Sequence, residues 1–170
     1  MPPNGGKLQT ISDIIEKNMN ALEKILENIP YLSADDIIQT LGAEMYKGED
    51  KDFPELDKLG NYPNFIQDAI YIIAFDTELA VNGIGGVLDN MIDSIILKII
   101  KAFQNIGANQ EADILSKINV INQTSPFSNE IETLRKSLYL YTDFDIWSLL
   151  KIYVEQEKNK YIANMHLNHQ

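Results

Sequence analysis

The sequence predicts an all-α fold, a single-domain helical bundle of about six to eight helices. Apolar residues recur at three- and four-residue steps along most of the chain, which is the spacing of amphipathic helices. No segment sustains the alternation of apolar and polar residues that a half-buried strand requires. With 170 residues, 45% of them hydrophobic, the chain is long enough to bury one core. We expect a disordered Pro/Gly-rich leader over residues 1–8 and one helical domain over residues 9–165.

The expected helices are separated by glycine, proline and polar residues. We expect them over residues 11–29, 33–47, 64–83, 91–107, 109–121, 128–141 and 145–165. Ser12 or Asp13 lies near the start of the first helix, and Ser33 is the expected N-cap of the second. Residues 48–63 are expected to form a loop with one short helical turn. Gly107 is the expected C-terminal stop of the fourth helix.

Three glycines cluster in the stretch ELAVNGIGGVLDN, residues 78–90, where a phosphate-binding loop has to be considered. A dinucleotide fingerprint needs a preceding strand and a third glycine, but the preceding segment is helical and Leu88 stands at that position. A P-loop needs Gly-Lys-Ser or Gly-Lys-Thr, which the chain lacks, and the surrounding carboxylates repel phosphate. We therefore interpret the stretch as a structural turn.

Each part of this stretch has an expected structural role. Gly83 takes a left-handed conformation and closes the preceding helix. Gly85 and Gly86 let the backbone turn sharply and pack closely. Asp89 or Asn90 then caps the following helix.

Negative charge is concentrated in the first half of the chain. The net charge is -11, and residues 35–93 alone hold 13 Asp or Glu against 3 Lys, whereas residues 94–170 hold 8 acidic and 8 basic residues. Such a chain is repelled by nucleic acid and by anionic membranes, so we expect neither as a direct partner. A surface dense in carboxylates competes for a basic protein partner, while a solvated face that only aids solubility is the alternative. The acidic residues expected to bind the partner are Asp35, Asp36, Glu44, Glu49, Asp50, Asp52, Glu55 and Asp57.

Few residues are available for catalysis. The chain has no cysteine, and its two histidines, His166 and His169, lie in the last five residues, which excludes Ser-His-Asp and Cys-His catalysis. We expect no catalytic residue, no metal site and no cofactor. One alternative stays open, a metal-assisted hydrolase or a small-ligand-binding protein. It would use four carboxylates around the glycine turn, namely Asp76, Glu78, Asp89 and Asp93.

The sequence is typical of a cytoplasmic protein. The absence of cysteine fits a reducing compartment, and residues 1–10 contain no apolar segment of the kind found in signal peptides. The longest apolar run, residues 69–75, is far shorter than a membrane span.

Two motifs resemble a known family. In the first, a helix ends in Glu-x-x-x-Asn-Gly and is followed by a glycine, two apolar residues and an Asn. In the second, a helix that ends in Ala-Ile-Gly-Ala in the family, and in Ile-Gly-Ala here, is followed by a short helix with a Leu-rich face. The residues concerned are Glu78, Asn82, Gly83, Gly86, Val87, Leu88 and Asn90, then Phe103, Ile106, Gly107 and Ala108. These motifs, with a similar closing helix in residues 138–161, resemble the DNA-mimic protein family, a bacterial family largely of unknown function. The resemblance covers roughly residues 60–160, and it departs at Val87, where many members carry an aromatic residue.

The resemblance implies an all-helical fold and no known catalytic activity, and from the namesake member it leaves a homodimer open. It also implies an acidic surface that stands in for DNA before a transcription regulator. Together with the charge distribution, this favours a non-enzymatic acidic interaction protein, a DNA mimic or an immunity-type protein. Its expected partner is a basic protein, such as a DNA-binding regulator or a toxin that it neutralises.

Overall fold

Seven α-helices and two short 3₁₀ helices make up the part of the chain that the structure describes, with no strand in it. The structure is a computed structural model, and it describes residues 19–49, 52–138 and 145–168. The predicted all-α helical bundle is confirmed. The α-helices are α2 (Ala21–Asn28), α3 (Ala34–Met45), α4 (Asn64–Asn90), α5 (Asp93–Asn105), α6 (Asn109–Thr124), α7 (Asn129–Arg135) and α8 (Ile146–Leu167). The 3₁₀ helices are η1 (Ile29–Tyr31) and η2 (Leu56–Lys58).

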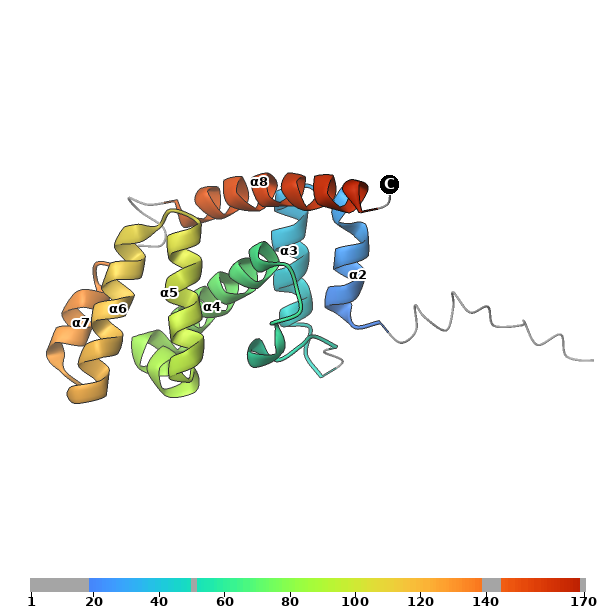
Figure 1. The fold of residues 1–170 in the computed structure, drawn as a ribbon. Helices are drawn as coiled ribbons and strands as arrows, with labels where there is room; N and C mark the ends of the chain where they lie inside the picture. The colour runs from blue at the N-terminus through green and yellow to red at the C-terminus, as the bar shows by residue number, and fades with distance from the viewer. Residues whose placement is uncertain (1–18, 50–51, 139–144, 169–170) are drawn as a thin grey trace, which may run out of the picture.

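Helix α4 is the centre of the bundle. It packs against α5, α8 and α3, while α5 packs on α6 and α6 on α7. Figure 1 shows α8 lying across the ends of α2 and α3. Of the described helices, α4 alone is long and apolar enough to cross a membrane by length and composition. Its residues 65–75 are all buried except Gln67, and the Phe75 ring meets that of Phe103 on α5 edge-on at 5.4 Å, as in a core helix.

One buried carboxylate ties three helices together inside this core. Asp68 on α4 is only 7% exposed, and its Oδ2 accepts hydrogen bonds from Asn105 Nδ2 on α5 at 2.9 Å and from the Tyr153 hydroxyl on α8 at 2.6 Å. Burial raises the pKa of Asp68, which the two hydrogen bonds only partly offset. The pKa of Tyr153 is also raised, by burial and by its bond to Asp68. This polar contact fixes how α4, α5 and α8 sit against one another.

The helix predicted over residues 11–29 is confirmed over residues 21–28, which form α2, but it is wrong at residues 19 and 20, which are not helical. Asn20 has an extended backbone and is the N-cap of α2, so the helix begins at Ala21. Asn20 and Glu23 form a reciprocal capping box: Glu23 N–H donates to Asn20 Oδ1 at 2.9 Å, and Asn20 N–H donates to Glu23 Oε2 at 2.8 Å. This local arrangement outweighs the apolar periodicity that continues through it. The expected starts at Ser12 or Asp13 lie outside the described residues.

The helix predicted over residues 128–141 ends early, because α7 stops at Arg135, but three other predicted features are confirmed. Ser33 is the N-cap of α3, in a second capping box with Asp36. Gly107, with φ of 88°, ends α5. The N–H groups of Gly107 and Ala108 donate to the carbonyls of Gln104 at 3.1 Å and Phe103 at 2.8 Å, which is a Schellman motif. The expected helical turn in the loop before α4 is η2.

Candidate functional site

Helix α4 bends at Gly83, in the middle of the glycine-rich stretch. Gly83 has φ of 68° and ψ of −173°, while the residues on both sides are helical. This region of backbone space is accessible essentially to glycine alone. The expected positive φ at Gly83 is therefore confirmed, although the residue joins two helical limbs and a loop does not follow it. We call residues 84–90 the second limb of α4.

Two further expectations for this stretch are wrong. Gly85 and Gly86 do not form a sharp turn, because both lie inside the helical second limb. Asp89 and Asn90 do not cap the next helix, since α5 begins at Asp93 with Ile92 as an N-cap that makes no side-chain hydrogen bond. The chain bends at Gly83 and breaks again at Met91 and Ile92, whose extended backbone separates α4 from α5.

Glu78 holds the bend closed. Its Oε1 accepts a hydrogen bond from Asn82 Nδ2 at 2.7 Å, and a second from Asn90 Nδ2 at 2.6 Å. In a straight helix, residues twelve positions apart are separated by about 18 Å along the axis, far beyond the reach of these side chains. The bond between Glu78 and Asn90 therefore exists only because the second limb folds back at Gly83.

Gly86 is required for the same contact. A Cβ atom at this position would lie 2.2 Å from Asn82 Cβ, closer than real contacts allow, and 3.0 Å from Glu78 Oε1, which is tighter than most real contacts. At Gly85, by contrast, nothing lies within 4 Å of such an atom. Glu78, Asn82, Gly86 and Asn90 thus form one polar clasp around the Gly83 bend. These four residues and Gly83 all belong to the first motif that resembles the family, and the structure brings them together in one feature.

The carboxylates proposed for a hydrolytic or metal site do not form such a site in the described residues. Glu78 is engaged in the clasp, and Asp89 and Asp93 are exposed. Among the residues described, no group of three or more His, Cys, Asp or Glu side chains is arranged to hold a metal ion. His166 is exposed in the last turn of α8, and His169 lies outside the described residues.

The expected partner-binding acidic residues separate into two groups, at opposite ends of α3. Asp35 and Asp36 lie in its first turn, and Glu44 lies roughly 13 Å further along the helix axis. Glu49, Asp52, Glu55 and Asp57 follow in the loop that leads to α4, and Asp50 lies outside the described residues. One end of α3 therefore faces α8, and the other carries most of the acidic residues (Figure 1).

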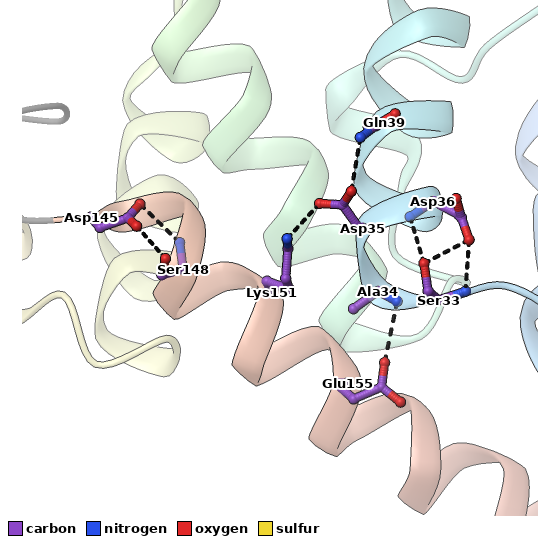
Figure 2. A network of polar contacts seen from close by, with 9 residues as sticks. All are labelled: Ser33, Ala34, Asp35, Asp36, Gln39, Asp145, Ser148, Lys151 and Glu155. Atoms are coloured by element: carbon purple, nitrogen blue, oxygen red, sulfur yellow. Dashed lines mark hydrogen bonds and ion pairs between the residues drawn. The ribbon is translucent and has the colours of Figure 1, made fainter.

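At the first end, both carboxylates have partners within the protein (Figure 2). Asp36 Oδ2 accepts hydrogen bonds from the N–H of Ser33 at 3.1 Å and from its hydroxyl at 2.6 Å. These bonds lower the pKa of Asp36. Asp35 accepts a bond from Gln39 at 2.9 Å and forms an ion pair with Lys151 Nζ at 2.8 Å.

Helix α8 supplies further contacts at this end, shown in part in Figure 2. Glu155 Oε2 accepts a hydrogen bond from the N–H of Ala34 at 3.2 Å, which satisfies a free donor at the start of α3. Lys158, only 7% exposed, donates to Leu32 O at 3.1 Å and to Glu155 at 2.9 Å. The bond from Lys158 is the largest cause that lowers the pKa of Glu155. We call these contacts the α3–α8 junction; sequence reasoning missed it, although Lys151, Glu155 and Lys158 share one face of α8.

The second end carries free negative charge. We call residues 49–57 the acidic loop. Glu49, Asp52, Glu55 and Asp57 are all exposed, and none of them forms an ion pair with a cation in the described part of the chain. Glu44, just before the loop, is 3.4 Å from Lys47 Nζ. An exposed pair of this kind is weak, so most of the negative electrostatic potential at this end of α3 remains.

A family model described as DMP19-like protein matches residues 60–157. The chain matches no curated protein and no solved structure. The matched segment runs from just before α4 into α8, so it contains the Gly83 bend and the polar clasp. It begins after the acidic loop.

Proposed function

Because the chain belongs to the DMP19-like protein family, whose model matches more than half of its residues, we propose that it is a non-enzymatic, acidic interaction protein. Its partner is a basic protein, a DNA-binding regulator or a toxin, and the protein acts in the cytoplasm. The acidic loop occupies the partner's cationic surface in place of DNA phosphates. Binding of this kind involves no chemical reaction and needs no cofactor. The described part of the chain holds no cluster of metal ligands that would favour the hydrolase alternative.

One observation carries the proposal: the acidic loop holds four exposed carboxylates without an ion-pair partner among the described residues. Asp35 and Asp36, at the other end of α3, already have partners, and this makes the loop the better candidate for binding. In a protein of net charge -11, such a group accelerates encounter with a cationic protein and makes the association sensitive to salt.

The test compares two variants with the same change in net charge. Asp52→Asn, Glu55→Gln and Asp57→Asn together neutralise the acidic loop, whereas Asp93→Asn, Asp113→Asn and Glu130→Gln neutralise exposed residues elsewhere. Purified DNA-binding regulators from the source cell are tested for association with each, in low and high salt and with duplex DNA as a competitor.

We expect at least one regulator to bind the protein, and its affinity should fall by roughly tenfold or more for the acidic-loop variant. For the control variant the affinity should fall much less, because local charge sets the strength of the interaction. Duplex DNA should displace the protein, and high salt should reduce the affinity. If both variants bind as the unmodified protein does, the acidic loop is not the binding surface. If no regulator binds, the partner is not a DNA-binding regulator.

A further inference from the structure

A groove of about 300 Å³ lies between the second limb of α4 and the start of α7. Its apolar lining comes from Ile84 and Leu88 on the second limb and Ile131 on α7. Asp89 and Glu132 also line it, and Phe127 stands beside it in the connection between α6 and α7. We call it the Phe127 groove. Its volume is at the lower end for ligand sites, which suits one or two anchoring side chains.

Phe127 occupies a backbone position that favours glycine. Residues 125–128 form a turn in which Ser128 N–H donates to Ser125 O at 3.2 Å. Pro126 is its second residue, and Phe127 is its third, with φ of 68°. This is the pattern of a type II turn, whose third position requires a positive φ and is normally glycine or asparagine. Among the described residues, Phe127 is the only non-glycine residue with a positive φ.

The side chain of Phe127 contributes little to the fold. It is 92% exposed, the most exposed of the large hydrophobic side chains described. The position therefore combines backbone strain with an aromatic ring in water, and both are unfavourable in the isolated protein. A strained, exposed aromatic residue at the edge of a groove is the arrangement expected where the ring packs against a bound molecule.

The charges around the groove define what fits it. Its lining includes two carboxylates, Asp89 and Glu132, and no described cation. Arg135 approaches Glu132 at 4.0 Å, but both side chains are exposed, so this pair is weak and leaves the carboxylate available. An apolar floor with an acidic rim is complementary to an apolar side chain flanked by Lys or Arg.

We propose that the Phe127 groove binds a peptide segment of a partner protein that presents one aliphatic or aromatic side chain flanked by Lys or Arg. The apolar side chain packs on Ile84, Leu88 and Ile131 beside the Phe127 ring. The flanking cations pair with Asp89 and Glu132, and a cation lying over the exposed ring gains a cation–π contact. The acidic loop is a different part of the chain, so this site does not rest on the function proposed above.

The probe is a random peptide library displayed on phage and selected against the full chain. We expect the selected peptides to share an apolar residue with neighbouring Lys or Arg. The affinity of a selected peptide should fall by roughly tenfold or more in Phe127→Gly, as for a central aromatic anchor. It should fall several-fold when Asp89→Asn and Glu132→Gln are combined, and more so at low salt.

Two controls separate binding from folding. Phe127→Gly should leave the melting temperature unchanged or raise it, because glycine suits the turn. Tyr31→Ser removes another exposed aromatic, 86% exposed in η1, and should leave the peptide affinity unchanged. The three-residue acidic-loop variant should leave it nearly unchanged as well.

Several outcomes would overturn the proposal. The library would yield no shared motif, or peptides with acidic flanks, or peptides whose affinity does not change in Phe127→Gly. A concentration-dependent dimer that sedimentation detects and Phe127→Gly abolishes would assign the groove to a second copy of this chain instead.

Discussion

Replacing Gly83 with alanine isolates the contribution of the backbone to the bend in α4. The residue has φ of 68° and ψ of −173°, and nothing lies within 4 Å of a Cβ atom built on it. Alanine therefore meets no neighbour, and its whole effect comes from a backbone conformation that non-glycine residues avoid. Strain of this kind is about 1–3 kcal/mol. We expect Gly83→Ala to lower the free energy of unfolding by that amount.

Gly85→Ala is the matched control, two residues away. Gly85 is helical and exposed, and a Cβ atom there also has open space. Alanine is favoured over glycine inside a helix by roughly 0.5–1 kcal/mol, so this variant should be more stable than the unmodified protein. The two variants should differ by about 1.5–4 kcal/mol.

Urea unfolding followed by circular dichroism measures both free energies. For a chain of this size, each 1 kcal/mol shifts the melting temperature by about 2–4 °C, so the two variants should melt roughly 3–16 °C apart. If Gly83→Ala is as stable as Gly85→Ala, the positive φ at Gly83 is not a feature of the folded protein. The polar clasp, which depends on that bend, would then be refuted as well.

Three further predictions concern the polar contacts. Glu78→Ala removes the oxygen that accepts both hydrogen bonds and should lower the free energy of unfolding by about 1–2 kcal/mol. Glu78→Gln keeps an accepting oxygen and should lower it by under about 0.5 kcal/mol. Equal losses of the two variants in urea unfolding would contradict the polar clasp. The pKa of Asp68 is raised in the folded state, so the contribution of this residue to stability should fall as pH rises above the ordinary value of 3.8. Over the pH range in which the folded protein keeps this proton and the unfolded chain does not, the contribution of Asp68 to the free energy of unfolding falls by at most about 1.4 kcal/mol per pH unit. Asp68→Asn removes this slope, so its stability relative to the unmodified protein should rise between about pH 4 and pH 7, and a pH-independent difference would refute this. Lys158→Ala should lower the free energy of unfolding by about 1–3 kcal/mol because it removes the hydrogen bonds of a buried side chain to the partly buried Leu32 O and Glu155. Lys160→Ala, on the exposed side of α8, should change the free energy of unfolding by under about 0.5 kcal/mol, as thermal unfolding would show.

Features set by neighbouring residues could be predicted from the sequence. The helical class follows from apolar periodicity, which is local. The Ser33 cap and the Gly107 stop follow from side-chain and backbone preferences within one turn of helix, and the structure confirms both. Asn20 shows the limit of this approach, since two local signals compete there and the capping box prevails over the periodicity.

Features that depend on distant residues could not be predicted. A positive φ at Gly83 is compatible with a helix end or with a second helical limb, and only the folded structure selects the limb. The bond from Asn90 to Glu78 depends on that choice. The α3–α8 junction joins residues more than a hundred positions apart, and no local pattern in α8 identifies the start of α3 as its partner. The charge distribution therefore predicts an acidic surface but does not show that the carboxylates at the start of α3 are paired within the α3–α8 junction.

The position of the acidic loop relative to the matched segment has a consequence for how the protein can be altered. The bend, the clasp and most of the buried core lie within residues 60–157, whereas the loop precedes them, and among its described residues Phe53 alone is buried. Scaffold and charge are therefore carried by separate stretches of chain. A loop of different charge could be grafted between α3 and α4 while the scaffold stays intact, which would make the choice of partner an interchangeable property.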